Sequence, residues 1–177
     1  MLESFLQMFT NPGPASFINF TFLPKYTFYF VQGVKYTLML SVVAVLLAVI
    51  PALLLALMRL SKSRIIRWIS GAYIAIFRST PMLVQLYIIY LGVFSFIEVP
   101  KMTIFGFLRL DLFIPSVVAL ALNSSAYVAE IFRAGILAVD AGQTEAARSL
   151  GLSSWQSMRL VVLPQAVKNV LPALANE

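Results

Sequence analysis

The segment from Tyr36 to Leu60, YTLMLSVVAVLLAVIPALLLALMRL, carries no charge until Arg59. A helix needs about 20 apolar residues to cross the hydrocarbon layer of a bilayer. This segment is long enough, so it predicts a membrane-spanning helix over residues 36–60. Pro51 lies inside it, and membrane helices tolerate proline where neighbouring groups satisfy the freed carbonyl.

The composition extends this prediction to the whole chain. Of 177 residues, 60% are hydrophobic and 11% charged, against about 45–50% and about 25% in soluble domains. The sequence therefore predicts an all-α integral membrane protein. Cysteine and histidine are absent, which removes the usual zinc ligands and the commonest general base. We expect no catalytic residue, no metal site and no cofactor bound by this chain.

The distribution of charge indicates the topology. The net charge is +6, but the basic residues are spread along the chain beside apolar spans, which favours contact with membrane lipid over nucleic acid. A basic cluster follows the first span, so the positive-inside rule places that loop in the cytoplasm. Residues 1–32 are predicted to form an aromatic segment at the membrane interface, before the first span. The aromatic residues are Phe17, Phe20, Phe22, Tyr26, Phe28, Tyr29 and Phe30.

A second span is predicted over residues 66–97, with a break at 78–81, where the sequence reads RSTP. Thr80 is a suitable N-cap and Pro81 a suitable first helical residue, so we expect a new helix to start there. Broken helices occur in transport proteins because the exposed N–H groups of a half-helix can bind a substrate. A simple proline kink is the alternative.

The third predicted span, residues 112–139, carries a polar stripe of Ser116, Asn123, Tyr127 and Glu130 at helical spacing. Glu130 is the only carboxylate inside an apolar span, and such a group is a functional hypothesis by default. A structural pair with Arg133 is the competing interpretation. Alanines on this helix would let a neighbouring helix approach closely; they are Ala119, Ala126, Ala129 and Ala134.

These features define a predicted substrate pathway. In such a pathway Glu130 would meet an ammonium group of a substrate, and backbone N–H groups at the break would meet a carboxylate. Arg78 is expected to bind phospholipid or to hold the break in place. The predicted pathway residues are Ser79, Thr80, Gln85, Asn123, Tyr127, Glu130 and Arg133.

A polar cytoplasmic segment follows the third span. Two short helices are predicted over residues 144–160, with Thr144 as the first cap and Gly151 as the turn between them. Ser153 or Ser154 would cap the second helix. Pro164 is expected to mark its exit, and a further span is expected to start at about residue 163. Such a compact knob is suited to docking on another protein.

The same segment carries a family resemblance. Glu145-Ala146-Ala147, three residues, Gly151, nine residues, Val161, one residue and Leu163-Pro164 resemble the EAA motif of the transmembrane subunits of binding-protein-dependent ABC importers. The stretches YTLMLSVVAVLLA, IFRSTPMLVQLYIIYLG, LNSSAYVAEIFRAGI and SLGLSSWQSMRLVVLPQAVKNVLPALANE resemble permeases of the polar amino acid uptake group. The likeness is continuous from about Gly33 to Glu177.

The resemblance implies a fold, partners and a location. The fold would be the type I ABC importer transmembrane domain, over residues 33–177, in a bacterial cytoplasmic (inner) membrane. Two permease subunits, identical or sister chains, would each place a coupling helix in a groove of one of two ATPase subunits. An extracytoplasmic solute-binding protein would deliver a polar amino acid. The coupling residues would be Glu145, Ala146, Ala147, Gly151, Leu163 and Pro164.

The chain would be a transport subunit and not an enzyme. The sequence contains no GxxxxGK[ST] loop, so ATP and Mg²⁺ would bind the partner ATPase. An ABC permease for methionine or an osmolyte is the main alternative. A secondary transporter would be expected to show repeated halves, and a lipid-modifying enzyme would need clustered catalytic groups. A helix pair lying on the membrane without a partner is the simplest alternative for the knob. Relatives are expected to continue beyond LPALANE, so the chain is expected to be shortened at its C-terminus.

Overall fold

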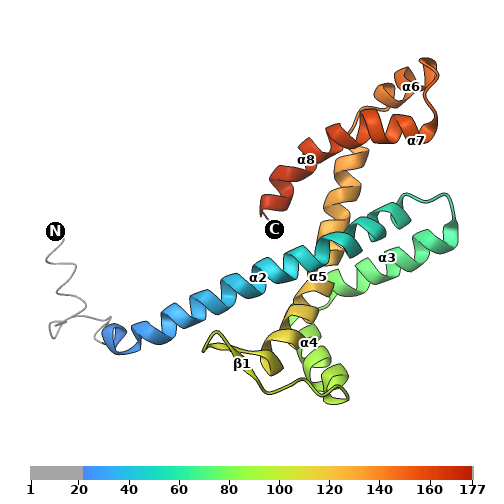
Figure 1. Ribbon diagram of the computed structural model, residues 1–177. Coiled ribbons are helices and arrows are strands. Elements are labelled where there is room, and N and C mark those ends of the chain that lie inside the picture. Colours follow the sequence, from blue (N-terminus) through green and yellow to red (C-terminus); the bar gives the residue numbers. More distant parts are fainter. Residues whose placement is uncertain (1–21, 177) are drawn as a thin grey trace, which may run out of the picture.

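The computed structural model describes residues 22–176 as an open arrangement of helices around α5 (Figure 1). The helices are α2 (Leu23–Arg59), α3 (Arg64–Ser79), α4 (Met82–Tyr87), α5 (Leu110–Leu137), α6 (Ala141–Ser149), α7 (Ser154–Ser157) and α8 (Leu163–Asn176). The π-helical turns η1 (Ile88–Gly92) and η3 (Met158–Val162) continue α4 and α7, and η2 (Val93–Ser95) is a 3₁₀ turn. Strands β1 (Thr103–Ile104) and β2 (Leu108–Arg109) form a hairpin.

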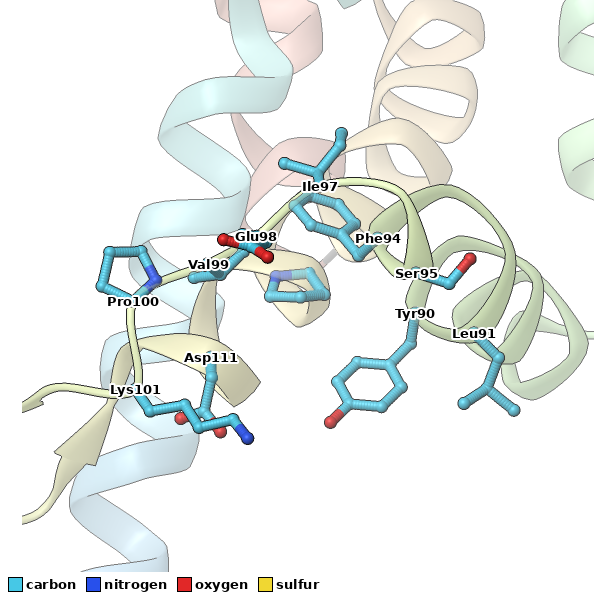
Figure 2. Close-up of a pocket in the computed structure, with 11 residues that line it drawn as sticks. Tyr90, Leu91, Phe94, Ser95, Ile97, Glu98, Val99, Pro100, Lys101 and Asp111 are labelled. Atoms are coloured by element: carbon cyan, nitrogen blue, oxygen red, sulfur yellow. The ribbon is translucent and has the colours of Figure 1, made fainter.

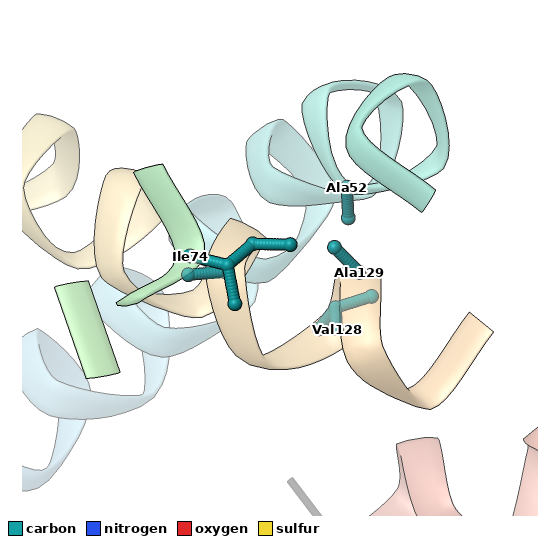
Figure 3. Packing of buried hydrophobic residues seen from close by; sticks show 5 residues of the cluster. Ala52, Ile74, Val128 and Ala129 are labelled. Atoms are coloured by element: carbon teal, nitrogen blue, oxygen red, sulfur yellow. The ribbon is translucent and has the colours of Figure 1, made fainter. Parts of the chain in front are cut away.

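The core lies where α2 crosses α5. Every fourth residue of α2 from Ala44 to Ala56 is an alanine, and all four are buried against the bundle. On α5, Ala126 and Ala129 are fully buried as well, and Figure 3 shows Ala52, Ile74, Val128 and Ala129 in this cluster. Small residues allow the two backbones to approach. Three of the four α5 alanines expected to do this are buried, whereas Ala134 is exposed.

The first helix is longer than the sequence predicted. It starts at Leu23 and continues unbroken to Arg59, so no boundary separates an interfacial segment ending at residue 32 from a span starting at 36. Pro24 stands in the first turn, where its missing N–H costs nothing, and no other residue before Tyr36 stops the helix. The part of that predicted segment before residue 22, including Phe17 and Phe20, lies outside the described residues.

The second span is broken, as predicted, within residues 78–81. The axes of Arg64–Ser79 and Met82–Ser95 differ by 105°. The cap differs from the prediction by one residue: Pro81 is the N-cap of α4, and the Thr80 hydroxyl instead donates back to the Ile76 carbonyl at 2.8 Å. By length and composition α2 and α5 can each cross a membrane, and the bent pair makes a third candidate span.

The loop before α5 contains a hairpin that the sequence analysis did not predict. Three residues, 105–107, connect the strands, and Phe105 and Gly106 among them have positive φ, 56° and 73°. The Phe107 N–H closes the turn by donating to the Ile104 carbonyl at 3.3 Å. Leu108 of β2 is 3% exposed and packs against α2 near Tyr36. The hairpin therefore ties this loop to the first helix. α5 follows from Leu110, two residues before its predicted start.

From Leu163, helix α8 continues the helix of α7 and η3 and packs along the end of α5. A Cβ built on Gly135 would lie 2.3 Å from Val170 Cγ2 and 3.3 Å from the Ala166 carbonyl oxygen. Glycine is therefore needed for this close approach of the two helices.

Candidate functional site

The knob beyond α5 is built from local capping interactions. Asp140, and not the predicted Thr144, caps α6: its Oδ1 accepts a hydrogen bond from the Gly142 N–H at 2.6 Å. Asp140 stands directly before the helix, where a carboxylate satisfies an unpaired N–H and favours the positive helix end. Thr144 and Glu145 are therefore already inside the helix.

Gly151 forms the predicted turn, and the prediction of a left-handed backbone there is confirmed at φ +84°. The Gly151 N–H donates to the Arg148 carbonyl at 3.0 Å, and the Leu152 N–H donates to the Ala147 carbonyl at 3.2 Å. These two bonds form a Schellman motif, in which glycine is the preferred left-handed residue. The Arg148 side chain also donates to the Leu152 carbonyl at 2.9 Å.

A capping box starts the second helix of the knob. Ser153 Oγ accepts from the Gln156 N–H at 3.2 Å, and Gln156 Oε1 accepts from the Ser153 N–H at 2.8 Å. Ser153 is therefore the cap, of the two serines considered. The sequence predicted that this helix ends near residue 160. In the structure it instead continues through η3 into α8. Pro164 lies in the first turn after the π-helical segment η3, at the second position of α8.

The knob presents apolar side chains to solvent. Leu150 is 84% and Trp155 70% exposed, while Ala147 is buried. Glu145 and Ala146 are exposed, so the two alanines of the motif face opposite ways. Sequence reasoning did not single out Leu150 and Trp155; the signal was present as two large apolar residues in an otherwise polar segment. Contiguous exposed apolar patches mark contact surfaces, and Leu150 and Trp155 are the large apolar side chains exposed on α6, α7 and the turn between them.

A cavity of about 490 Å³ opens where α5 faces α3 and α8. The Arg78 guanidinium lies 5.2 Å from the centre of the Tyr127 ring, within the range of a cation–π contact. Tyr127 and Glu130 were predicted pathway residues; Arg78 and Asn169 join them here. The lining residues are Arg78, Tyr127, Glu130, Ile131, Ala134, Gly135, Ala138, Asn169 and Ala173.

Glu130 is held by two arginines. Arg133 donates through Nε to Oε2 at 2.8 Å, and its Nη2 lies 2.7 Å from the same oxygen, which confirms the predicted pair. Arg59 Nε lies 3.8 Å from Oε1, a partner that sequence spacing did not reveal because it comes from another helix. The Glu130 side chain is 18% exposed. Oε2 is thus engaged closely and Oε1 only loosely, so Oε1 can accept a further hydrogen bond.

The remaining predicted pathway residues lie elsewhere. Gln85, Asn123 and Thr80 bond to one another and to the backbone at the helix break, and Ser79 donates to Ile76 at 3.4 Å. Neither these four residues nor Arg133 belong to the lining of the cavity. The structure therefore divides the predicted set into a cavity group, Tyr127 and Glu130 with Arg133 bound to Glu130, and a break group of the other four residues.

A larger cavity, about 720 Å³, lies at the other end of α5, away from the knob. Figure 2 shows its wall, from Tyr90 and Phe94 on the helical side to Pro100 and Lys101 on the loop. Asp111 in this wall accepts from Arg109 Nη2 at 2.6 Å. This hydrogen bond and the carboxylate charge raise the pKa of Arg109. Among residues 22–176, no three carboxylates gather as metal ligands.

The chain matches one protein family over residues 44–177, described as "Binding-protein-dependent transport system inner membrane component". Among curated proteins, it is 40% identical over 156 residues to the "Putative glutamine transport system permease protein GlnP" of Rickettsia prowazekii (strain Madrid E). That alignment covers 88% of this chain and 67% of the relative.

Two further relatives and one solved structure extend the comparison. The "Arginine transport system permease protein ArtQ" of Bacillus subtilis (strain 168) is 42% identical, covering 84% of this chain and 64% of the relative. The "Octopine transport system permease protein OccM" of Rhizobium radiobacter is 44% identical, covering 82% and 59%. The "Crystal structure of an amino acid ABC transporter with histidines" aligns with a TM-score of 0.76 at 46% identity, covering 91% of this chain and 71% of that one.

Proposed function

Because the chain belongs to the family of binding-protein-dependent transport system inner membrane components, we propose that it couples ATP hydrolysis by a partner to passage of a polar amino acid. It is a permease subunit of an amino acid ABC importer, of the polar amino acid group. It is an inner membrane transport component and not a catalyst. The sequence-based expectation of this family is confirmed. ATPase and binding-protein partners follow from the family.

The observation that carries the coupling proposal is the exposed apolar surface of the knob. Leu150 and Trp155 flank the Gly151 turn and are 84% and 70% exposed. Tryptophan in particular contributes strongly to binding when a partner buries it. We infer that α6 and α7 dock on the ATPase, one permease subunit on each of two ATPase subunits. Glu145 and Ala146 lie on the exposed side of α6 and would contact the partner.

A continuous helical connection would carry motion from the knob to the membrane. Ala147 is buried and holds α6 against the rest of the knob. The second helix of the knob continues through Leu163 and Pro164 into α8 without a break. α8 in turn packs tightly on α5 at Gly135. Movement of the ATPase would therefore displace α8 and α5 together, and so alternate the access of the cavity between two sides of the membrane.

The cavity at Glu130 supports an amino acid as the substrate. Arg78 would bind the α-carboxylate, because a guanidinium matches the fork of a carboxylate. Oε1 of Glu130 would accept a hydrogen bond from the ammonium group, and Tyr127 and Asn169 would supply neutral polar contacts. The relatives named for glutamine, arginine and octopine support this substrate class. A second permease subunit, identical or a sister chain, would complete the pathway.

Capture by an ATPase is the experiment that tests the coupling proposal. The membrane-expressed chain would be used to pull down candidate ABC ATPases, beside Gly151→Asp. Capture by the wild type that is lost in this variant supports the proposal. If neither chain captures any ATPase, the coupling role is refuted. Uptake of radiolabelled L-glutamine by vesicles that contain the assembled complex then tests the substrate class.

A further inference from the structure

The break between α3 and α4 leaves a backbone acceptor that needs a new partner. In a continuous helix the Phe77 carbonyl would accept from the N–H of residue 81, but Pro81 has none. An unpaired carbonyl is costly within a bilayer, where no water replaces the lost bond. Here two side-chain amides replace it: Gln85 Nε2 at 2.8 Å and Asn123 Nδ2 at 3.3 Å.

Gln85 is the centre of a buried network. Its Nε2 also lies 3.0 Å from the Thr80 carbonyl and 2.6 Å from Thr80 Oγ1. Its Oε1 accepts from Asn123 Nδ2 at 2.9 Å. The Gln85 side chain is buried. From α4 its amide bonds both the end of α3, at Phe77 and Thr80, and Asn123 on α5. We name the set of Phe77, Thr80, Gln85 and Asn123 the amide latch.

A second contact ties the same end of α3 to α5. The Tyr73 hydroxyl donates to the Leu122 carbonyl at 2.9 Å and lies 2.9 Å from Ser125 Oγ. Tyr73 is one helical turn before Phe77, and Leu122 precedes Asn123. The two contacts therefore fix the end of α3 against α5 at consecutive turns, and the bend depends on α5 as much as on Pro81.

The latch stands directly beside the cavity without lining it. Arg78 follows Phe77 in the chain, and Tyr127 lies one helical turn after Asn123. Arg78 and Tyr127 meet at 5.2 Å in the cavity wall. We propose that Gln85 and Asn123 are positioning residues, which hold the broken span against α5 and thereby set where Arg78 stands in the cavity. The reading of the cavity as a substrate site rests on the proposed function; the positioning of Arg78 does not.

A distance measurement across the break tests this proposal directly. The chain has no cysteine of its own, so spin labels can be placed by Trp68→Cys and Leu91→Cys, both at exposed positions. Pulsed electron paramagnetic resonance would measure the distance between the two spin labels, with the chain and its partner ATPase assembled in nanodiscs. Gln85→Leu and Asn123→Leu should shift and broaden the distance. Ser116→Ala is the matched control, because that hydroxyl bonds only within α5, to the Leu112 carbonyl at 2.8 Å.

Transport kinetics provide a second measurement. Gln85→Leu should raise the KM for L-glutamine about tenfold with a smaller change in kcat, because a displaced Arg78 binds the carboxylate less well. Unchanged distance in both Leu variants would overturn the proposal. Because the distance needs no substrate, a wild type that shows no L-glutamine uptake but a latch-dependent distance would exclude L-glutamine as the substrate and still support the positioning role.

A double variant separates positioning from simple stabilisation. Gln85→Leu with Pro81→Ala restores an N–H for the Phe77 carbonyl while removing the latch. If Gln85 only satisfies that carbonyl, this variant recovers both assembly and L-glutamine uptake, and the proposal is wrong. If Gln85 positions Arg78, this variant still recovers assembly. The distance between the spin labels then lengthens because α3 and α4 straighten, and the KM for L-glutamine stays high.

Discussion

The cytoplasmic knob and the break in the second span both interrupt helices, but they are built in opposite ways. In the knob, the capping bonds join residues close in sequence, such as Asp140 with Gly142 and Ser153 with Gln156. At the break, the bonds join distant helices, as Asn123 does with Phe77. The knob is therefore specified by its own sequence, whereas the break starts from the local Pro81 and is held in addition by side chains of α5.

The two regions also differ in exposure. The knob turns large apolar groups outward, with Leu150 at 84% exposed. The break turns polar groups inward, with Gln85 at 7%. Changes in the knob should consequently alter binding to a partner and leave the fold intact. Changes in the membrane interior should alter stability and transport while leaving the docking surface in place.

Gly151→Asp should have the largest effect on the knob. Apart from its two chain neighbours, no residue has a heavy atom within 4 Å of a Cβ built there, so the Cβ itself is not crowded, but φ is +84°. The left-handed backbone costs about 1 kcal/mol for a non-glycine residue, and the carboxylate adds a charge to the docking surface. We expect ATPase capture and L-glutamine uptake to fall to background, while membrane insertion is unchanged.

Gly151→Ala is the matched control for that variant, because it carries the backbone strain without the charge. It should retain part of the capture. If Gly151→Asp is inserted and transports normally, the knob is not the coupling element. The contrast between a knob that exposes its side chains for binding and a break that buries them then fails.

Glu130→Gln should have the next largest effect, and this variant tests the membrane interior and not the knob. It removes the charge that Arg133 binds at 2.7 Å, leaving two arginines without their carboxylate. Removing one partner of a buried pair costs about 3–5 kcal/mol, and less here because the Glu130 side chain is 18% exposed. We expect lower thermal stability and reduced L-glutamine uptake, with ATPase capture retained at low temperature. Normal uptake at reduced stability would assign Glu130 a structural role only.

Trp155→Ala should weaken ATPase capture without destabilising the chain. A tryptophan at a binding centre contributes about 2 kcal/mol or more, so capture affinity should fall about thirtyfold. Because Trp155 is 70% exposed, its removal opens no internal cavity. Trp68→Ala is the matched control, since Trp68 is 73% exposed on α3 and lies outside the knob. Equal loss of capture in both variants would contradict a docking role specific to Trp155.

The same contrast explains which features could be predicted from the sequence. The Gly151 turn and the pairing of Glu130 with Arg133 depend on neighbours in sequence, and both were predicted correctly. The Arg59 contact to Glu130 and the amide latch depend on how α2, α3 and α5 pack, so residue spacing along one helix could not reveal them. The extended α2 was missed because aromatic residues before Tyr36 suggested an interface, although no residue there stops a helix.

Asp140→Ala should have the smallest effect and tests a local detail that the sequence analysis placed wrongly, the cap of α6. Loss of an N-cap carboxylate costs about 1 kcal/mol of helix stability, which lowers capture about fivefold if α6 must be formed to dock. Thr144→Ala should change capture little, because Thr144 lies inside α6 and does not cap it. Titration of each variant with a captured ATPase would measure the difference. A larger loss with Thr144→Ala than with Asp140→Ala would show that α6 starts at Thr144 when docked, so that the partner, and not local capping alone, sets its first turn.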